Sequence, residues 1–208
     1  MKFARHKVRE EIKAKAAATK AACDRHRIDG LVREAAGGNF EAFGEIYSIY
    51  LDRIYRYIFY QIKDEMAAQD LTQEVFIKAW KAMSSIRGEG KTFQSWLYRI
   101  ARNHLIDYLR GTKKSSSLDR ENLPEISDPK PEVGTELERR ELLKTIDCLP
   151  DNQKQVIILK FLEGQNNQEI AGIMGKREGA IRVLQMRALA NLRQKLNEEN
   201  DRNGKQTG

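Results

Sequence analysis

Residues Asn166–Leu196 read NNQEIAGIMGKREGAIRVLQMRALANLRQKL, and this stretch has the pattern of a helix-turn-helix. Asn166 is suited to cap a helix, and Glu169 three residues later can reach back to it, which makes a capping box. Gly175 suits the positive φ that ends a helix and permits a tight turn. A second helix is expected from about Glu178. The pattern therefore predicts two helices joined by a short turn.

Apolar side chains at helical spacing give each of these two helices an inner face. They are Ile170, Ala171 and Met174 in the first helix, and Ala180, Ile181 and Leu184 in the second. In a helix-turn-helix the second helix enters the major groove of DNA. Its outward residues here are of types that pair with base edges, namely Arg177, Glu178, Arg182, Gln185 and Arg187. A solvated face on a small helical bundle is the alternative interpretation of the same residues.

The rest of the chain is also helical in pattern, and no stretch alternates with the period of two that strands require. Between Asn39 and Arg110 a buried stripe recurs at steps of three and four residues: Phe43, Ile46, Tyr47, Tyr50, Ile54, Tyr57 and Ile58. Further helices are expected from about Ala67 to Met83 and from about Phe93 to Leu109. Three of the four prolines and a serine run fall in the segment that follows, which is typical of a linker.

The fold class we predict is all-α, with two small helical domains joined by a flexible linker, the second domain containing the helix-turn-helix. A disordered tail or a marginal helix both explain the Lys/Arg/Ala-rich start of the chain. The predicted parts are a basic N-terminal extension (1–36), a first domain (37–111), a linker (112–134), a second domain (135–198) and a C-terminal tail (199–208).

Composition narrows the classes of function. The chain has 37 Lys+Arg against 30 Asp+Glu and a net charge of +7, which permits binding to nucleic acid. No apolar run reaches the ~18 residues of a membrane span, so no membrane insertion is expected. Cys23 and Cys148 are far apart, and such sparse cysteines fit a reducing, cytoplasmic location. His6, His26 and His104 form no ligand spacing, so we expect no metal, no cofactor and no catalytic residues.

One segment departs from this basic character. Gln69–Trp80 reads QDLTQEVFIKAW, and no Lys or Arg lies between Lys63 and Lys78, whereas Asp70 and Glu74 are acidic. Residues four apart share one face of a helix, so these two carboxylates can act together. Leu71, Val75 and Ala79 are expected to face the core.

Four segments in order resemble bacterial sigma factors of the extracytoplasmic-function (ECF) type. They are NFEAFGEIYSIYLDRIYRYIFYQI, QDLTQEVFIKAW, GKTFQSWLYRIARNHLIDYLR, and LPDNQKQVIILKFLEGQNNQEIAGIMG with the helix after it. The resemblance covers about Asn39 to Leu196. It implies an alternative sigma factor that binds core RNA polymerase and directs it to promoters. Such a protein recognises the −35 element through its helix-turn-helix and melts the −10 element.

The resemblance also implies a role for individual residues. Docking on a coiled coil of the largest polymerase subunit would use Asp70, Leu71, Gln73, Glu74, Phe76 and Trp80, although Phe76 could instead fill the core of the domain. Contact with the −10 element would use Lys91, Thr92, Phe93, Trp96, Arg99 and Asn103, with Asn103 as a base-edge reader and Trp96 as a support for the loop. Contact with the −35 element would use Arg177, Glu178, Arg182, Val183, Gln185, Met186 and Arg187. An anti-sigma factor is a further implied partner.

The chain departs from the common family pattern at two positions of the second helix. Many relatives have a polar Ser at Val183 and a basic residue at Leu184, so the promoter sequence does not follow from the resemblance. Two other classes of function remain as alternatives. A repressor or activator that acts through its helix-turn-helix alone explains the C-terminal half but gives the acidic helix no role. A metal-dependent nuclease would use Asp64, Glu65, Asp70 and Glu74, but lacks an evident catalytic base.

Overall fold

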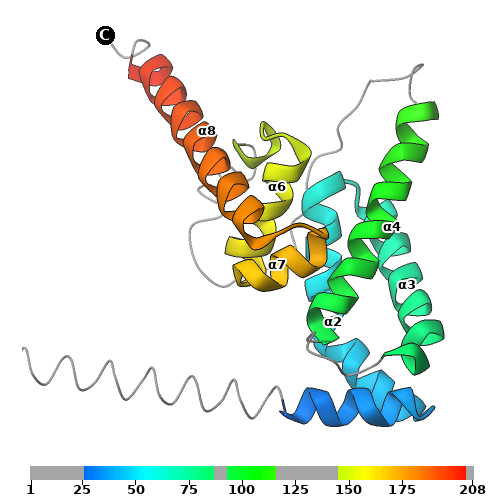
Figure 1. The fold of residues 1–208 in the computed structure, drawn as a ribbon. Helices are drawn as coiled ribbons and strands as arrows, with labels where there is room; N and C mark the ends of the chain where they lie inside the picture. The colour runs from blue at the N-terminus through cyan, green and yellow to red at the C-terminus, as the bar shows by residue number, and fades with distance from the viewer. Residues whose placement is uncertain (1–25, 87–92, 116–144, 205–208) are drawn as a thin grey trace, which may run out of the picture.

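The computed structural model describes residues 26–86, 93–115 and 145–204, and every regular element in these ranges is a helix (Figure 1). This confirms the predicted all-α class. The expected linker, the C-terminal tail beyond residue 204 and most of the N-terminal extension lie outside the described residues. None of the helices in the described ranges is both long and apolar enough to cross a bilayer.

Helices α2 (Phe40–Ile62), α3 (Glu65–Ala82) and α4 (Phe93–Ser115) form the main part of the first domain, and local signals explain where α2 and α3 begin. Helix α2 starts after Asn39, whose side chain accepts hydrogen bonds from two backbone N–H groups of the first turn. It ends at Lys63, which takes the left-handed conformation. Asp64 then caps α3 by accepting from the N–H of Ala67. Short polar side chains at these positions satisfy donors that a helix start leaves without partners. A 3₁₀ turn (Met83–Ser85) follows, and α4 completes the domain.

The first domain begins earlier than the sequence predicts. Residues 26–36 are helical, which is one of the two states that the sequence left open for the start of the chain. Leu31 and Ala35, four residues apart, are buried in the core, and Arg27 forms an ion pair of 2.8 Å with Glu45 of α2. Ile28, Val32 and Ala36 pack beside them, so one face of this short helix lies against the core.

The second domain has the break that the sequence predicts at Gly175. Helix α6 (Asp151–Ile157) follows Pro150 and runs directly into a π-helical turn (Ile158–Leu162), which the sequence pattern did not indicate. Helices α7 (Asn167–Met174) and α8 (Glu178–Gly204) are separated by Gly175, whose φ of 63° is the left-handed cap predicted for it. Helix α8 continues six residues past the predicted end of the domain at 198.

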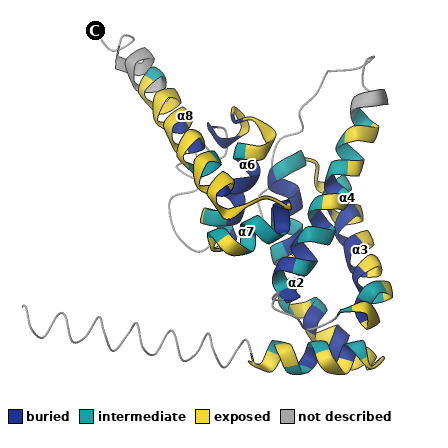
Figure 2. Cartoon of the chain, in the orientation of Figure 1, coloured by how far each residue is buried: buried dark blue, intermediate teal, exposed yellow. Residues whose placement is uncertain are grey.

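The two domains pack on one another instead of lying apart. Helix α7 lies against α4, and α2 touches the π-helical turn, so buried residues of both halves form one continuous core (Figures 1 and 2). The sequence predicted two domains but not this contact. Helix α8 projects away from the core and is largely exposed along its length (Figure 2).

Candidate functional site

The outer face of α3 carries the acidic group that the sequence singled out. Asp70, Gln73 and Glu74 are all exposed. The Glu74 carboxylate lies 2.6 Å from Nε2 of His104, and Nδ1 of the same ring lies 2.6 Å from the Lys78 ammonium. His104 comes from α4 and is mostly covered, so it fixes the position of Glu74 on the surface. Two carboxylates one helical turn apart are thus presented to a basic partner.

The inner face of α3 belongs to the core. Leu71 and Phe76 are 5% and 3% exposed, and the Phe76 ring packs 4.7 Å from that of Tyr47. Val75 and Ala79 are fully buried, as predicted. A partner that docks on α3 cannot reach Leu71 or Phe76 in this conformation. The accessible docking surface therefore contains fewer of the residues than the resemblance implied.

Two apolar side chains that the sequence analysis did not select enlarge the accessible surface. Ile77 is 53% exposed and lies on α3 beside Gln73 and Glu74, at the spacing of neighbours on one helix face. Phe40 is 71% exposed, and its ring meets the half-buried Trp80 edge-on at 5.6 Å. Ile77 could have been found from its position four residues after Gln73. Phe40 could not, because α2 supplies it through tertiary contact.

Helix α4 begins with an aromatic cluster. Phe93 is buried and packs 5.5 Å from both Tyr50 and Trp96, so Phe93 supports the start of the helix from within. Trp96 is half-buried, and the supporting role predicted for it stays a prediction. Arg99 is also half-buried and Asn103 is exposed. The other two residues predicted here, Lys91 and Thr92, lie outside the described residues.

The helix-turn-helix has the predicted geometry. The Asn166 side chain accepts from the Glu169 N–H at 2.9 Å, and the Glu169 carboxylate accepts from the Asn166 N–H at 2.8 Å. Ile181 of α8 is fully buried, whereas Ala180 is exposed. The prediction that Ala180 packs inward was therefore wrong. The buried residues of α8 are Ile181, Ala188 and Leu192, which share one face, and Ala180 lies about 100° away from Ile181 around the helix.

The start of α8 presents a mixed polar and apolar face. Arg177, Glu178, Arg182 and Arg187 are exposed, Gln185 is half-buried, and Val183 and Met186 are 41% and 65% exposed. Arg182 is held by Glu178 at 2.6 Å, an i,i+4 ion pair on the surface. All seven residues predicted for this face lie on the turn before α8 and on its first turns, and the buried Ile181 anchors that stretch.

Comparison with known proteins identifies the family. Residues 46–115 match the family model of Sigma-70 region 2, and residues 139–192 match that of Sigma-70, region 4. The ECF RNA polymerase sigma factor BldN of Streptomyces coelicolor is 34% identical over 173 residues, which cover 81% of this chain and 66% of BldN. The ECF RNA polymerase sigma-E factor of Escherichia coli K12 is 38% identical over 131 residues, covering 57% of this chain and 68% of that protein. The chain belongs to the ECF-type sigma factors.

Solved structures share the fold of this chain. A structure of CnrH in complex with the cytosolic domain of CnrY superposes with a TM-score of 0.64 at 25% identity, covering 84% of this chain and 98% of that one. The sigma factor RpoE of Bartonella quintana, solved with the anti-sigma factor NepR, gives a TM-score of 0.64 at 23% identity over 74% of this chain and 96% of that one, and supports the fold. The chain spans 66% of the length of BldN and 42% of that of RfaY, a relative from Xanthomonas campestris.

Proposed function

We propose that this protein is an alternative sigma factor that binds core RNA polymerase and directs it to specific promoters. The observation that carries the proposal is the presence, on one chain, of two accessible faces of opposite character. The outer face of α3 presents Asp70 and Glu74, and the start of α8 presents Arg177, Arg182 and Arg187. A protein that bridges another protein to DNA needs two such faces, since phosphates attract one and repel the other.

The acidic face is the docking surface for polymerase in this proposal. Its polar contacts are Asp70, Gln73 and Glu74, and Ile77 and Trp80 supply apolar area beside them. Aromatic and aliphatic side chains ringed by charges are typical of interface centres. Leu71 and Phe76 act from beneath by holding α3 in place.

In this proposal α8 and α4 contact the promoter. The start of α8 enters the major groove at the −35 element, where Arg182 and Arg187 read base edges or phosphates and Val183 offers apolar contact to a thymine methyl group. Helix α4 and the residues before it hold the unpaired −10 strand through Arg99, Asn103 and the predicted Lys91 and Thr92. Trp96 and Phe93 support that surface from within. Strand capture of this kind uses stacking and charge, not covalent chemistry.

Partners and setting follow from the same proposal. Sigma factors are DNA-binding regulators, and we propose that this one has no catalytic activity of its own and acts in the cytoplasm, where polymerase is. An anti-sigma factor is a further proposed partner, because RpoE of Bartonella quintana was solved with one.

Transcription from genomic DNA with purified core polymerase, with and without this protein, tests the proposal. We expect new start sites that share a common upstream sequence and appear only when both components are present. A protein that binds its DNA site tightly without polymerase, and starts no transcription with it, would instead be a helix-turn-helix repressor or activator.

A further inference from the structure

Helices α3 and α4 lie side by side (Figure 1), and a histidine of α4 separates two charged side chains of α3. Glu74 and Lys78 are four residues apart with the acid on the N-terminal side, which is the spacing and order that favours a direct ion pair on a helix surface. Within the described residues these two side chains form no ion pair with each other. The ring of His104 contacts both instead: Nδ1 lies 2.6 Å from the Lys78 ammonium, and Nε2 lies 2.6 Å from a Glu74 carboxylate oxygen.

The contacts of the ring determine where its proton lies. A Lys ammonium has donors only, so Lys78 donates to Nδ1, and that nitrogen must keep its lone pair. The ring is therefore neutral in this arrangement, with its proton on Nε2, the nitrogen beside Glu74. The Nε2–H group is not aligned along the 2.6 Å line to the carboxylate, so this contact is electrostatic and lacks the geometry of a hydrogen bond.

The packing of α4 on α3 holds the ring in this position. The His104 side chain is 13% exposed, and its neighbours Ala101 and Leu105 on α4 are fully buried. The Glu74 side chain, in contrast, is 57% exposed and so lies on the surface. An anchored, uncharged ring is thus placed between a surface carboxylate and the ammonium that would otherwise neutralise it.

This separation changes the charge that the outer face of α3 presents. A direct pair with Lys78 would compensate the Glu74 carboxylate and would bring an ammonium group onto that face. Like charges set against each other at an interface are unfavourable, so a basic partner would then meet repulsion where it now meets a carboxylate. With Lys78 bound to the neutral ring, Glu74 keeps its negative charge for a partner.

We propose that His104 is a positioning residue for polymerase docking: it separates Lys78 from Glu74 and so keeps the Glu74 carboxylate available to the polymerase. The inference rests on the proposed function for the identity of the partner. The separation of the two charges is a property of the isolated chain. In this arrangement His104 acts through Glu74 and Lys78.

A suppressor variant tests the proposal, with core affinity measured by fluorescence anisotropy of the full chain titrated with core polymerase. His104→Ala frees Lys78 to pair with Glu74, and we expect core affinity to fall about 10-fold or more. His104→Ala combined with Lys78→Met removes the competing cation and should restore the affinity of the wild type. His104→Gln keeps one acceptor and one donor and should also restore it. Asp107→Ala, which removes only an exposed ion pair with Arg110 on α4, is the matched control and should leave core affinity unchanged.

The suppressor distinguishes positioning from support of the fold. A His104→Ala variant that binds core as tightly as the wild type would overturn the proposal. A loss of affinity that Lys78→Met does not reverse would overturn it too, because His104 would then only support the packing of α4. Weaker binding by Lys78→Met alone would show that Lys78 itself contacts the polymerase, and would contradict the proposal in the same way.

Nuclear magnetic resonance of the His104 ring nitrogens tests the charge separation without polymerase. At about pH 8, where an ordinary imidazole is neutral, we expect the full chain to carry the ring proton on Nε2 alone. Lys78→Met should allow the form protonated on Nδ1 to appear. A wild-type ring protonated on Nδ1 would overturn the inference, because Lys78 cannot donate to a protonated nitrogen. A chain with the expected ring that binds no core polymerase would instead refute the proposed function, so the two failures are distinguishable.

Discussion

Reversing both charges on the outer face of α3 is the sharpest test of polymerase docking. The change is Asp70→Lys together with Glu74→Lys. In the isolated chain both side chains are exposed, and the Glu74 side chain is 57% accessible beside His104. Exposed ion pairs contribute about 0.2–1 kcal/mol, so the free energy of unfolding should change by no more than about 1 kcal/mol.

The expected effect on docking is much larger. Once the polymerase covers α3, the carboxylates pair with cations in a desolvated contact, and losing one such partner costs about 2–5 kcal/mol. Two reversals, each of which adds repulsion, should weaken core affinity by about 1,000-fold or more. The difference between these two magnitudes is the signature of a surface that is used for binding and not for folding.

Core affinity is measured by fluorescence anisotropy of labelled protein titrated with core polymerase, and folding by circular dichroism during thermal unfolding. Glu45→Lys with Asp52→Lys is the matched control, since it changes the net charge equally at two exposed sites on α2 and, like the α3 variant, removes one surface ion pair, that of Glu45 with Arg27. A double variant of α3 whose core affinity stays within tenfold of wild type would refute the docking assignment. Equal losses in both double variants would show that bulk charge, not the α3 face, sets the affinity.

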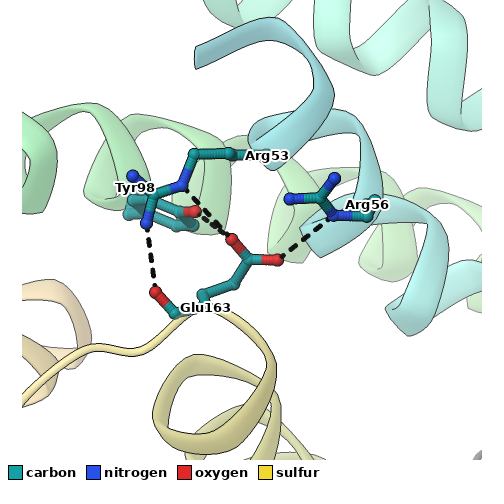
Figure 3. Close-up of polar contacts among 4 residues, drawn as sticks. All are labelled: Arg53, Arg56, Tyr98 and Glu163. Atoms are coloured by element: carbon teal, nitrogen blue, oxygen red, sulfur yellow. Dashed lines mark hydrogen bonds and ion pairs between the residues drawn. The ribbon is translucent and has the colours of Figure 1, made fainter. Parts of the chain in front are cut away.

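Three further predictions concern the other parts of the chain. Arg182→Ala and Arg187→Ala should each reduce transcription from the native promoter by about 5- to 150-fold, which is the value of one base contact, and should leave core affinity unchanged. Transcription equal to that of the wild type would exclude such contacts. Asn166→Ala removes the cap of α7 and should lower the free energy of unfolding by about 1 kcal/mol in a denaturant titration, whereas no loss would mean that packing alone holds α7. Burial of Glu163 beside Tyr98, Arg53 and Arg56 raises the pKa of its carboxyl (Figure 3). The stability tied to that proton is present at low pH and is lost as pH rises through the raised pKa, so the free energy of unfolding should fall over that range in the wild type but not in Glu163→Gln.

Local signals were sufficient to predict much of this protein. The capping box at Asn166, the left-handed Gly175 and the buried stripe of α2 follow from side-chain chemistry at fixed spacing, because helix ends and helix faces are decided within a few residues. The acidic face of α3 and the basic start of α8 follow for the same reason, since neighbours on one helix face are set by sequence separation.

Contacts between residues far apart in the chain could not be predicted in this way. Phe40 reaches Trp80, the helix at residues 26–36 gains its place through Leu31 and Ala35, and Phe76 is committed to the core by Tyr47. The contact around Glu163 is the largest such case, because it joins residues 65 and 110 positions apart and depends on how two helical domains fit together. Local sequence thus specified the helices and the charge of their faces. Long-range packing decided which helix faces are accessible and which are covered. The reason is that close packing requires the surfaces of all the helices to fit one another at the same time.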